Sequence, residues 1–225
     1  MIALIRMRLT AFLVSGRVIA PAVAVLAVLA VLHGGGTSPA ASAYGYSATV
    51  LFPVLAWSAK LVLDTEPDVQ RRLARISIGA GAEGAAGVLA AAIVGLAVCV
   101  LAMIVPIAIG AISFSSLVGG LVLGALAHLL ALVAAVALGA LASRAVTRSI
   151  GKGVMVLASG AVLYIVLGLK GSIAPWLVPP ILATARALNG DALPDPARLG
   201  VLSAWAAGWS LVVLAGYAWL RRRRA

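Results

Sequence analysis

"GAAGVLAAAIVGLAVCVLAMIVPIAI", residues 84–109, contains no charged side chain. A helix needs about 20 mostly apolar residues to cross the hydrocarbon core of a bilayer, so this run is long enough to span a membrane. Apolar and polar residues do not alternate along it, which excludes a strand of a membrane barrel. Because backbone groups in lipid must find their hydrogen-bond partners within the segment, the sequence predicts a membrane-spanning helix here.

The rest of the chain has the same character. Hydrophobic residues make up 64% of it and charged residues only 10%, with a mean hydropathy of +1.16. Water-soluble domains carry about 25% charged residues, because their surfaces face water. Most of this surface is therefore expected to contact membrane lipid.

Six apolar runs are long enough to be spans. They are 18–34, 46–63, 84–109, 116–142, 154–171 and 199–220. The sequence thus predicts an all-α integral membrane protein with six transmembrane helices in a single domain, residues 1–225.

The basic residues predict how this bundle is oriented. With six spans and the N-terminus inside, fourteen of the 17 lysines and arginines lie on the cytoplasmic side, and only Lys170, Arg186 and Arg198 lie outside. This bias follows the positive-inside rule and predicts two cytoplasmic termini in a multi-pass protein of a bacterial cell membrane. Lys60, at the inner end of the second span, is expected to reach the nearby interface. The basic residues form no continuous stripe, so no nucleic-acid partner is predicted.

Residues 2–16 are too short and too charged to cross a membrane. Their apolar residues recur at helical spacing, with Arg6 and Arg8 between them. They form either an interfacial helix with its arginines toward the headgroups or a simple positive flank of the first span. Arg6 and Arg8, the apolar run to Leu32 and "ASA" at 41–43 together resemble a cleavable signal peptide, but the apolar run is long and the cut site lies well beyond its end, so a retained first span is favoured.

"LDTEPDVQRRLARISIG", residues 63–79, is the one stretch that reads like a soluble protein. Thr65 or Glu66 can cap a helix there, and Pro67 fits its first turn. Acids come first and arginines later, as the helix dipole favours, and Gly79 supplies a stop. The pattern predicts a short cytoplasmic helix over 65–78.

Val69, Leu73 and Ile76 form one apolar stripe on this predicted helix. A loop that only anchors topology would need the arginines alone. An apolar stripe outside the membrane requires a membrane surface or a groove on another protein, and docking to a partner is the favoured interpretation.

The layout resembles the permeases of type-two ABC exporters: six spans, inside termini, an interfacial N-terminal segment and a cytoplasmic helix after the second span. The resemblance implies that 65–78 is the coupling helix, which docks into a separate ATPase subunit holding ATP and Mg. The implied docking residues are Glu66, Pro67, Asp68, Arg71, Arg72 and Arg75. It further implies a dimer, with an identical or a related permease, and transport outward.

The resemblance also covers an outer segment between the fifth and sixth spans, residues 172–198. Its prolines predict short broken helices dipping into the outer interface. These form either a lid on the exit path or a compact plug for helix ends.

The chain has no phosphate-binding loop of its own. "SIGKGV", residues 149–154, contains Gly-Lys, but Val146 and Gly153 occupy the positions that require glycine and Ser or Thr. No acid lies deep within a predicted span, as an ion-driven carrier would need. With one cysteine and two distant histidines, we predict no enzyme activity, no metal site and no cofactor in this chain.

His128, near the middle of the fourth span, is the one candidate on a substrate path. Gly120, Gly124 and His128 share a helix face, and small residues at this spacing mark close contact between helices. A neutral histidine bonded to a neighbouring hydroxyl or carbonyl is the favoured interpretation, and a polar point on a translocation path is the alternative.

The sequence therefore predicts the permease subunit of an ATP-driven exporter. A non-transporting membrane anchor or assembly subunit is the alternative. The transported substrate is not identified by any motif.

Overall fold

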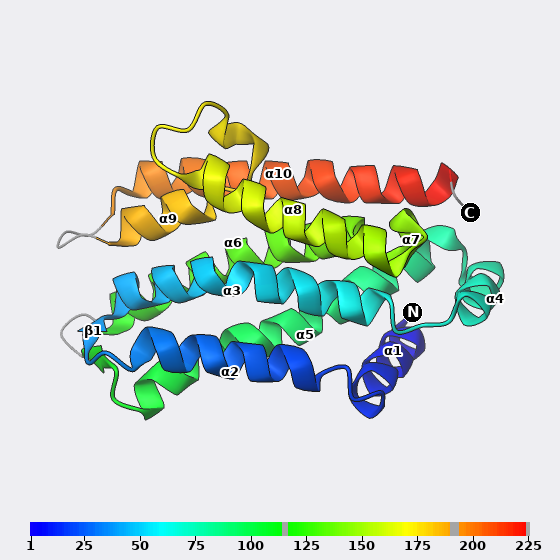
Figure 1. Ribbon diagram of the computed structural model, residues 1–225, viewed down its shortest axis with the longest axis horizontal. Coiled ribbons are helices and arrows are strands. Elements are labelled where there is room, and N and C mark those ends of the chain that lie inside the picture. The colour runs from blue at the N-terminus through cyan, green and yellow to red at the C-terminus, as the bar shows by residue number, and fades with distance from the viewer. Residues whose placement is uncertain (114–116, 190–193, 224–225) are drawn as a thin grey trace.

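The computed structural model describes residues 1–113, 117–189 and 194–223. Long helices lie side by side along the longest axis, and the two described ends of the chain lie at the same end of the bundle (Figure 1). The elements are α1 Ile2–Val14, α2 Ile19–His33, β1 Ser38–Pro39, α3 Ala40–Leu63, α4 Asp68–Ile78, α5 Ala80–Ala108, β2 Ile112–Ser113, α6 Leu117–Leu141, α7 Arg144–Thr147, α8 Ile150–Gly168, the 3-10 turn η2 Pro175–Leu177, α9 Ile181–Leu188 and α10 Pro196–Arg223.

Five segments of the described chain are long and apolar enough to cross a membrane. Four are single helices, α3, α5, α8 and α10, and the fifth, Val118–Thr147, consists of α6 and α7 together. The number rises to six if α1 and α2 together form one bent span. An all-α protein with five or six candidate spans agrees with the predicted fold class, while the count of six stays a prediction.

The first predicted span, 18–34, is where the structure differs most from expectation. α2 has 15 residues, or about 22 Å, which is shorter than the hydrocarbon core of about 30 Å. A break at Ser15–Val18 separates it from α1, and the two helices meet at 75°. Gly16 makes this break possible with a φ of +69°, a left-handed conformation that only glycine adopts without strain.

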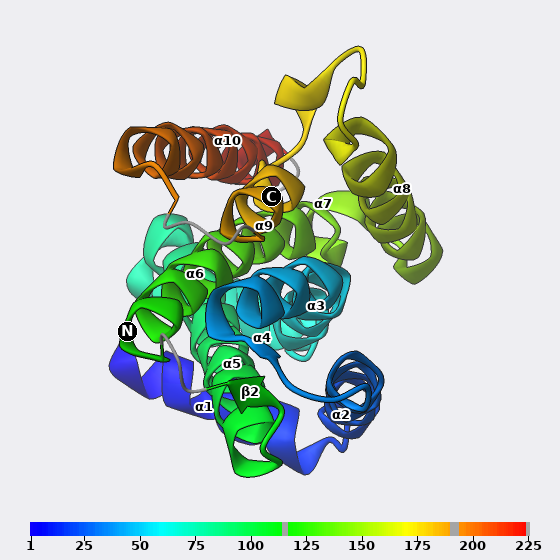
Figure 2. The same ribbon diagram turned by 90° about the vertical axis from the view of Figure 1, so that its left-hand side faces the viewer.

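The core lies between α3 and α6. They are the most buried of the candidate spans, whereas α8 and α10 are the most exposed. Figure 2 shows α3 and α6 in the middle, with α2, α5, α8 and α10 around them. Gly120, Gly124 and Gly139 of α6 contact Ala40, Tyr44 and Ala59 of α3, so the predicted small-residue face is confirmed as a close helix contact.

Replacing Gly124 by alanine is expected to destabilise this contact. An added Cβ would lie 2.6 Å from Cβ of Tyr44, and such overpacking costs about 1–3 kcal/mol. At Gly119 an added Cβ meets nothing within 4 Å, so Gly119→Ala should leave stability unchanged or raise it slightly. Thermal unfolding of the detergent-purified variants tests this, and equal unfolding temperatures would contradict the close contact.

The two ends of the bundle differ in chemistry. One end, here called the charged end, carries α1, α4, α7 and the last turn of α10 (Figure 1). At the opposite end β1 pairs in parallel with β2, and Ser38 N–H donates to the carbonyl of Ala111 at 3.0 Å. α9, within the predicted segment 172–198, buries Ile181, Ala185 and Leu188 in the bundle, and Ala185 contacts Gly45 of α3. Residues 190–193, and with them Asp191, lie outside the described residues.

Candidate partner-docking site

α4 lies at the charged end, beyond the ends of the long helices (Figure 1). It begins at Asp68 after Pro67, three residues later than predicted, and ends at Ile78, followed by Gly79 with a φ of +86°. Thr65 and Glu66 do not cap it, so that prediction is wrong. The Thr65 hydroxyl donates instead to the carbonyl of Leu61 at 2.7 Å, and the Glu66 carboxylate is taken by Arg8.

The outer face of α4 carries the predicted apolar stripe. Val69, Leu73 and Ile76 are 69%, 61% and 84% exposed. Side chains this exposed are not packed against the bundle, so the bundle does not account for an apolar stripe on this helix of 11 residues. The stripe is therefore free to contact another surface.

The inner face of α4 points into the bundle. Arg71 is 6% exposed, and its Nη2 donates to Asp68 Oδ1 at 2.8 Å and to the Glu66 carbonyl at 3.4 Å. Arg75 Nε donates to Glu83 at 3.3 Å. Of the six predicted docking residues, Glu66 and Arg71 are buried and Arg75 is partly buried, whereas Pro67, Asp68 and Arg72 are exposed.

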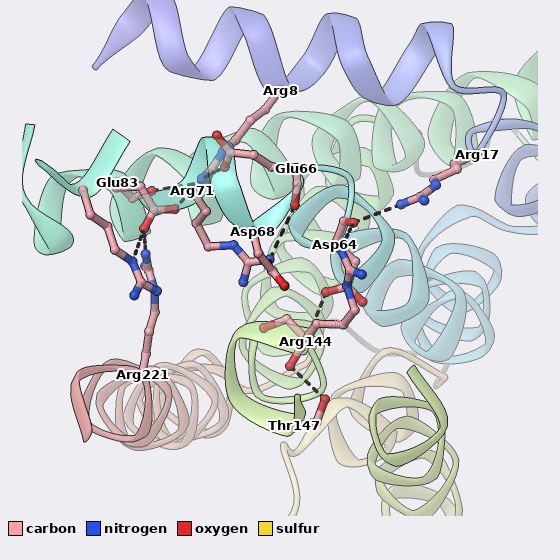
Figure 3. Close-up of polar contacts among 12 residues, drawn as sticks. Arg8, Arg17, Asp64, Glu66, Asp68, Arg71, Glu83, Arg144, Thr147 and Arg221 are labelled. Atoms are coloured by element: carbon pink, nitrogen blue, oxygen red, sulfur yellow. Dashed lines mark hydrogen bonds and ion pairs between the residues drawn. The ribbon is translucent and has the colours of Figure 1, made fainter. Parts of the chain in front are cut away.

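Glu83, in the first turn of α5, is the centre of a buried ion-pair cluster. Its carboxylate contacts Arg8 from α1, Arg75 from α4 and Arg221 from α10. Arg8 also contacts Glu66, and its Nη1 donates to the Glu83 carbonyl at 3.2 Å. Figure 3 shows Arg8 and Arg221 approaching Glu83 from opposite sides. The cluster therefore joins α4 to three helices that are far apart in the sequence.

Two glycines of α5 make room for this cluster. A Cβ at Gly84 would collide with the guanidinium of Arg221, and a Cβ at Gly87 with that of Arg8. The expectation that Arg8 faces the headgroups is thus wrong: the side chain is 4% exposed and lies inside the bundle. A buried carboxylate such as Glu83 is stable only when it is paired, and Arg8 is one of the residues that pair it.

A second buried group surrounds Asp64, the residue after α3. Lys60 Nζ contacts Asp64 Oδ2 at 2.6 Å, and the backbone N–H of Arg144, at the start of α7, donates to Oδ1 at 2.7 Å. The Asp64 carbonyl accepts bonds from Arg17 at 3.0 Å and from the Arg144 side chain at 3.1 Å (Figure 3). Lys60 is only 4% exposed, so the prediction that it reaches the interface is wrong.

Replacing Asp64 by asparagine removes the charge that neutralises Lys60 but keeps an acceptor for Arg144. We expect a loss of about 2 kcal/mol in the free energy of unfolding, because hydrogen bonds to charged groups contribute about that much. Asp68→Asn is the control, since the Asp68 side chain is 72% exposed and exposed pairs contribute under about 1 kcal/mol. Chemical unfolding in detergent micelles compares the two; similar losses would show that the Asp64 group does not stabilise the fold.

A basic groove of about 850 Å³ runs between α4 and α7. Arg72 and Arg148 line it together with Asp68, Arg71, Arg75, Ile76 and Ala145. It borders the apolar stripe, because Ile76 belongs to both. The exposed surface at this end therefore combines apolar contact area with positive charge.

His128 lies in the contact between α6 and α3 and is 1% exposed. Its Nδ1 is 2.8 Å from the Gly124 carbonyl, and its Nε2 is 3.1 Å from Ser47 Oγ. A carbonyl only accepts, so Nδ1 carries the proton and Nε2 is an acceptor. The Ser47 hydroxyl has one proton, which it donates either to Nε2 or to the Tyr44 carbonyl, also at 3.1 Å. This is the predicted bonding of a neutral packing histidine; a place on a substrate path stays a prediction.

No family model, curated protein or solved structure matches this chain.

Proposed function

We propose that this chain is the permease subunit of an ATP-driven exporter and that α4 is its docking helix for a separate ATPase. The observation that carries the proposal is the two-sided construction of α4. One face presents Val69, Leu73 and Ile76 to the outside. The other is held to the bundle by the ion pair of Arg75 with the buried Glu83. A docking helix that transmits force needs both properties.

Ion pairs connect α4 mechanically to the candidate membrane spans. Through Glu66 and Glu83, a displacement of α4 acts on α1, α5 and α10. Binding of ATP by two partner subunits would move two such helices together and tilt the bundles of a dimer. The ATP and its Mg would be held by the partner.

The charge distribution supports a cytoplasmic position for α4. Lys170, Arg186 and Arg198, the three basic residues assigned to the outside, follow α8 or belong to α9 and the start of α10, at the end opposite to α4 (Figure 1). The other described basic residues flank the charged end, as expected for the inner face of a bacterial cell membrane.

Purification of the tagged chain in mild detergent tests the proposal. We expect a soluble ATPase to be recovered with it, and the complex to hydrolyse ATP. Recovery of a partner without ATPase activity would contradict the proposal and favour a membrane anchor or assembly subunit.

A further inference from the structure

A groove of about 440 Å³ separates α5 from α10 at the charged end. Val88 and Leu89 of α5 and Leu214 of α10 line its apolar part. Arg75, Arg221 and Arg222, here called the basic rim, line it from α4 and the last turn of α10. Apolar walls below a basic rim are the shape and charge of a site for an amphipathic anion.

The carboxylate behind this rim is already shared. Glu83 contacts Arg8, Arg75 and Arg221, and Arg8 also contacts Glu66, so two carboxylates serve three arginines. Arg222 is exposed and forms no ion pair with any described residue. The rim therefore carries more positive charge than the described carboxylates neutralise, and closely spaced cations in a low-dielectric setting favour binding of an anion.

We propose that this groove binds an anionic phospholipid. The phosphate would lie between Arg75 and Arg222, and an acyl chain would follow Val88, Leu89 and Leu214 between the helices. Basic pockets between membrane-spanning helices recognise anionic headgroups in this way. A lipid is favoured over a soluble anion because the groove continues along apolar faces of two candidate spans.

The test measures lipid binding to the purified chain alone, so its outcome does not depend on the proposed ATPase. Native mass spectrometry compares phosphatidylglycerol with phosphatidylcholine. We expect phosphatidylglycerol to bind more tightly, and Arg222→Gln to weaken it about five-fold, since each basic residue near an anionic lipid contributes about 1 kcal/mol. Ala85→Phe, which fills the groove from an exposed position on α5, should reduce retention of this lipid further.

Two control variants match these changes. Arg72→Gln removes an exposed arginine of α4 outside the groove, and Ala207→Phe adds a ring at an exposed position of α10 away from it. Both should bind phosphatidylglycerol like the unmodified chain. Equal binding of the two lipids, or equal losses in Arg222→Gln and Arg72→Gln, would overturn the proposal. So would inorganic phosphate stabilising the protein against heat as well as phosphatidylglycerol does at the same concentration, because a lipid would then not be required.

Discussion

Glu83→Ala is expected to cause the largest loss of stability of any single substitution considered. The change removes the carboxylate shared by Arg8, Arg75 and Arg221, which leaves Arg8 with Glu66 alone and deprives the buried Arg221 and the partly buried Arg75 of their carboxylate. Breaking a buried ion pair by deleting one partner costs about 3–5 kcal/mol. For a chain of this size that corresponds to a fall of about 10 °C in the unfolding temperature.

Thermal unfolding in detergent, followed by size-exclusion chromatography, provides the measurement. Asp68→Ala is the matched control, because it also deletes an arginine's partner but at an exposed position. We expect that control to unfold within about 2 °C of the unmodified chain. If Glu83→Ala were as stable as the control, the cluster would not hold α1, α4 and α10 together.

Leu73→Asp combined with Ile76→Asp is expected to abolish binding of the proposed partner ATPase while the bundle remains folded. Both side chains are more than half exposed and form no part of the core. Deleting a central apolar contact costs an interface about 2 kcal/mol or more, which is about 30-fold in affinity for each residue. Two added carboxylates would also leave buried charges at the interface without partners.

The comparison uses the ATPase that is recovered with the unmodified chain. Gln70→Asp places the same kind of charge on α4 but at the flank of the stripe, and its effect should be small. Unchanged elution and unfolding temperature would show that each variant is folded. Full association of the double variant would exclude the outer face of α4 as the docking surface.

The structure also changes how the docking residues should be tested. Reversing the charges of Arg71 and Arg75 would disturb their contacts with Asp68 and with the buried Glu83 of the same chain, so a loss of binding would not identify an interface. Arg72 and Arg148, which line the basic groove, and the apolar stripe can be changed without breaking a described ion pair. Sequence spacing alone does not separate these two classes of arginine, because it does not say which side of α4 the bundle occupies.

The amino-acid sequence by itself determined the features that depend on neighbouring residues. Long uncharged runs such as 84–109 dictate helices, because lipid leaves the backbone no partner outside its own segment. The short amphipathic helix before Gly79 follows from the order of its acids, apolar residues and arginines. The grouping of Gly120 and Gly124 on one face likewise follows from the helical repeat alone.

Only the tertiary structure decided which charges meet. Arg8 lies 58 residues from Glu66 and 75 from Glu83, and Arg221 comes from the last helix. No local pattern predicts such a pairing, because it depends on the bend between α1 and α2 and on how each helix is rotated toward its neighbours. Gly84 and Gly87 are a sequence feature that reflects this cluster, because their missing side chains leave space for Arg221 and Arg8. From sequence alone, however, two small residues on a helix equally predict a close contact between helices. A buried charge takes the partner that the packing brings within reach, and that partner is set by the whole bundle.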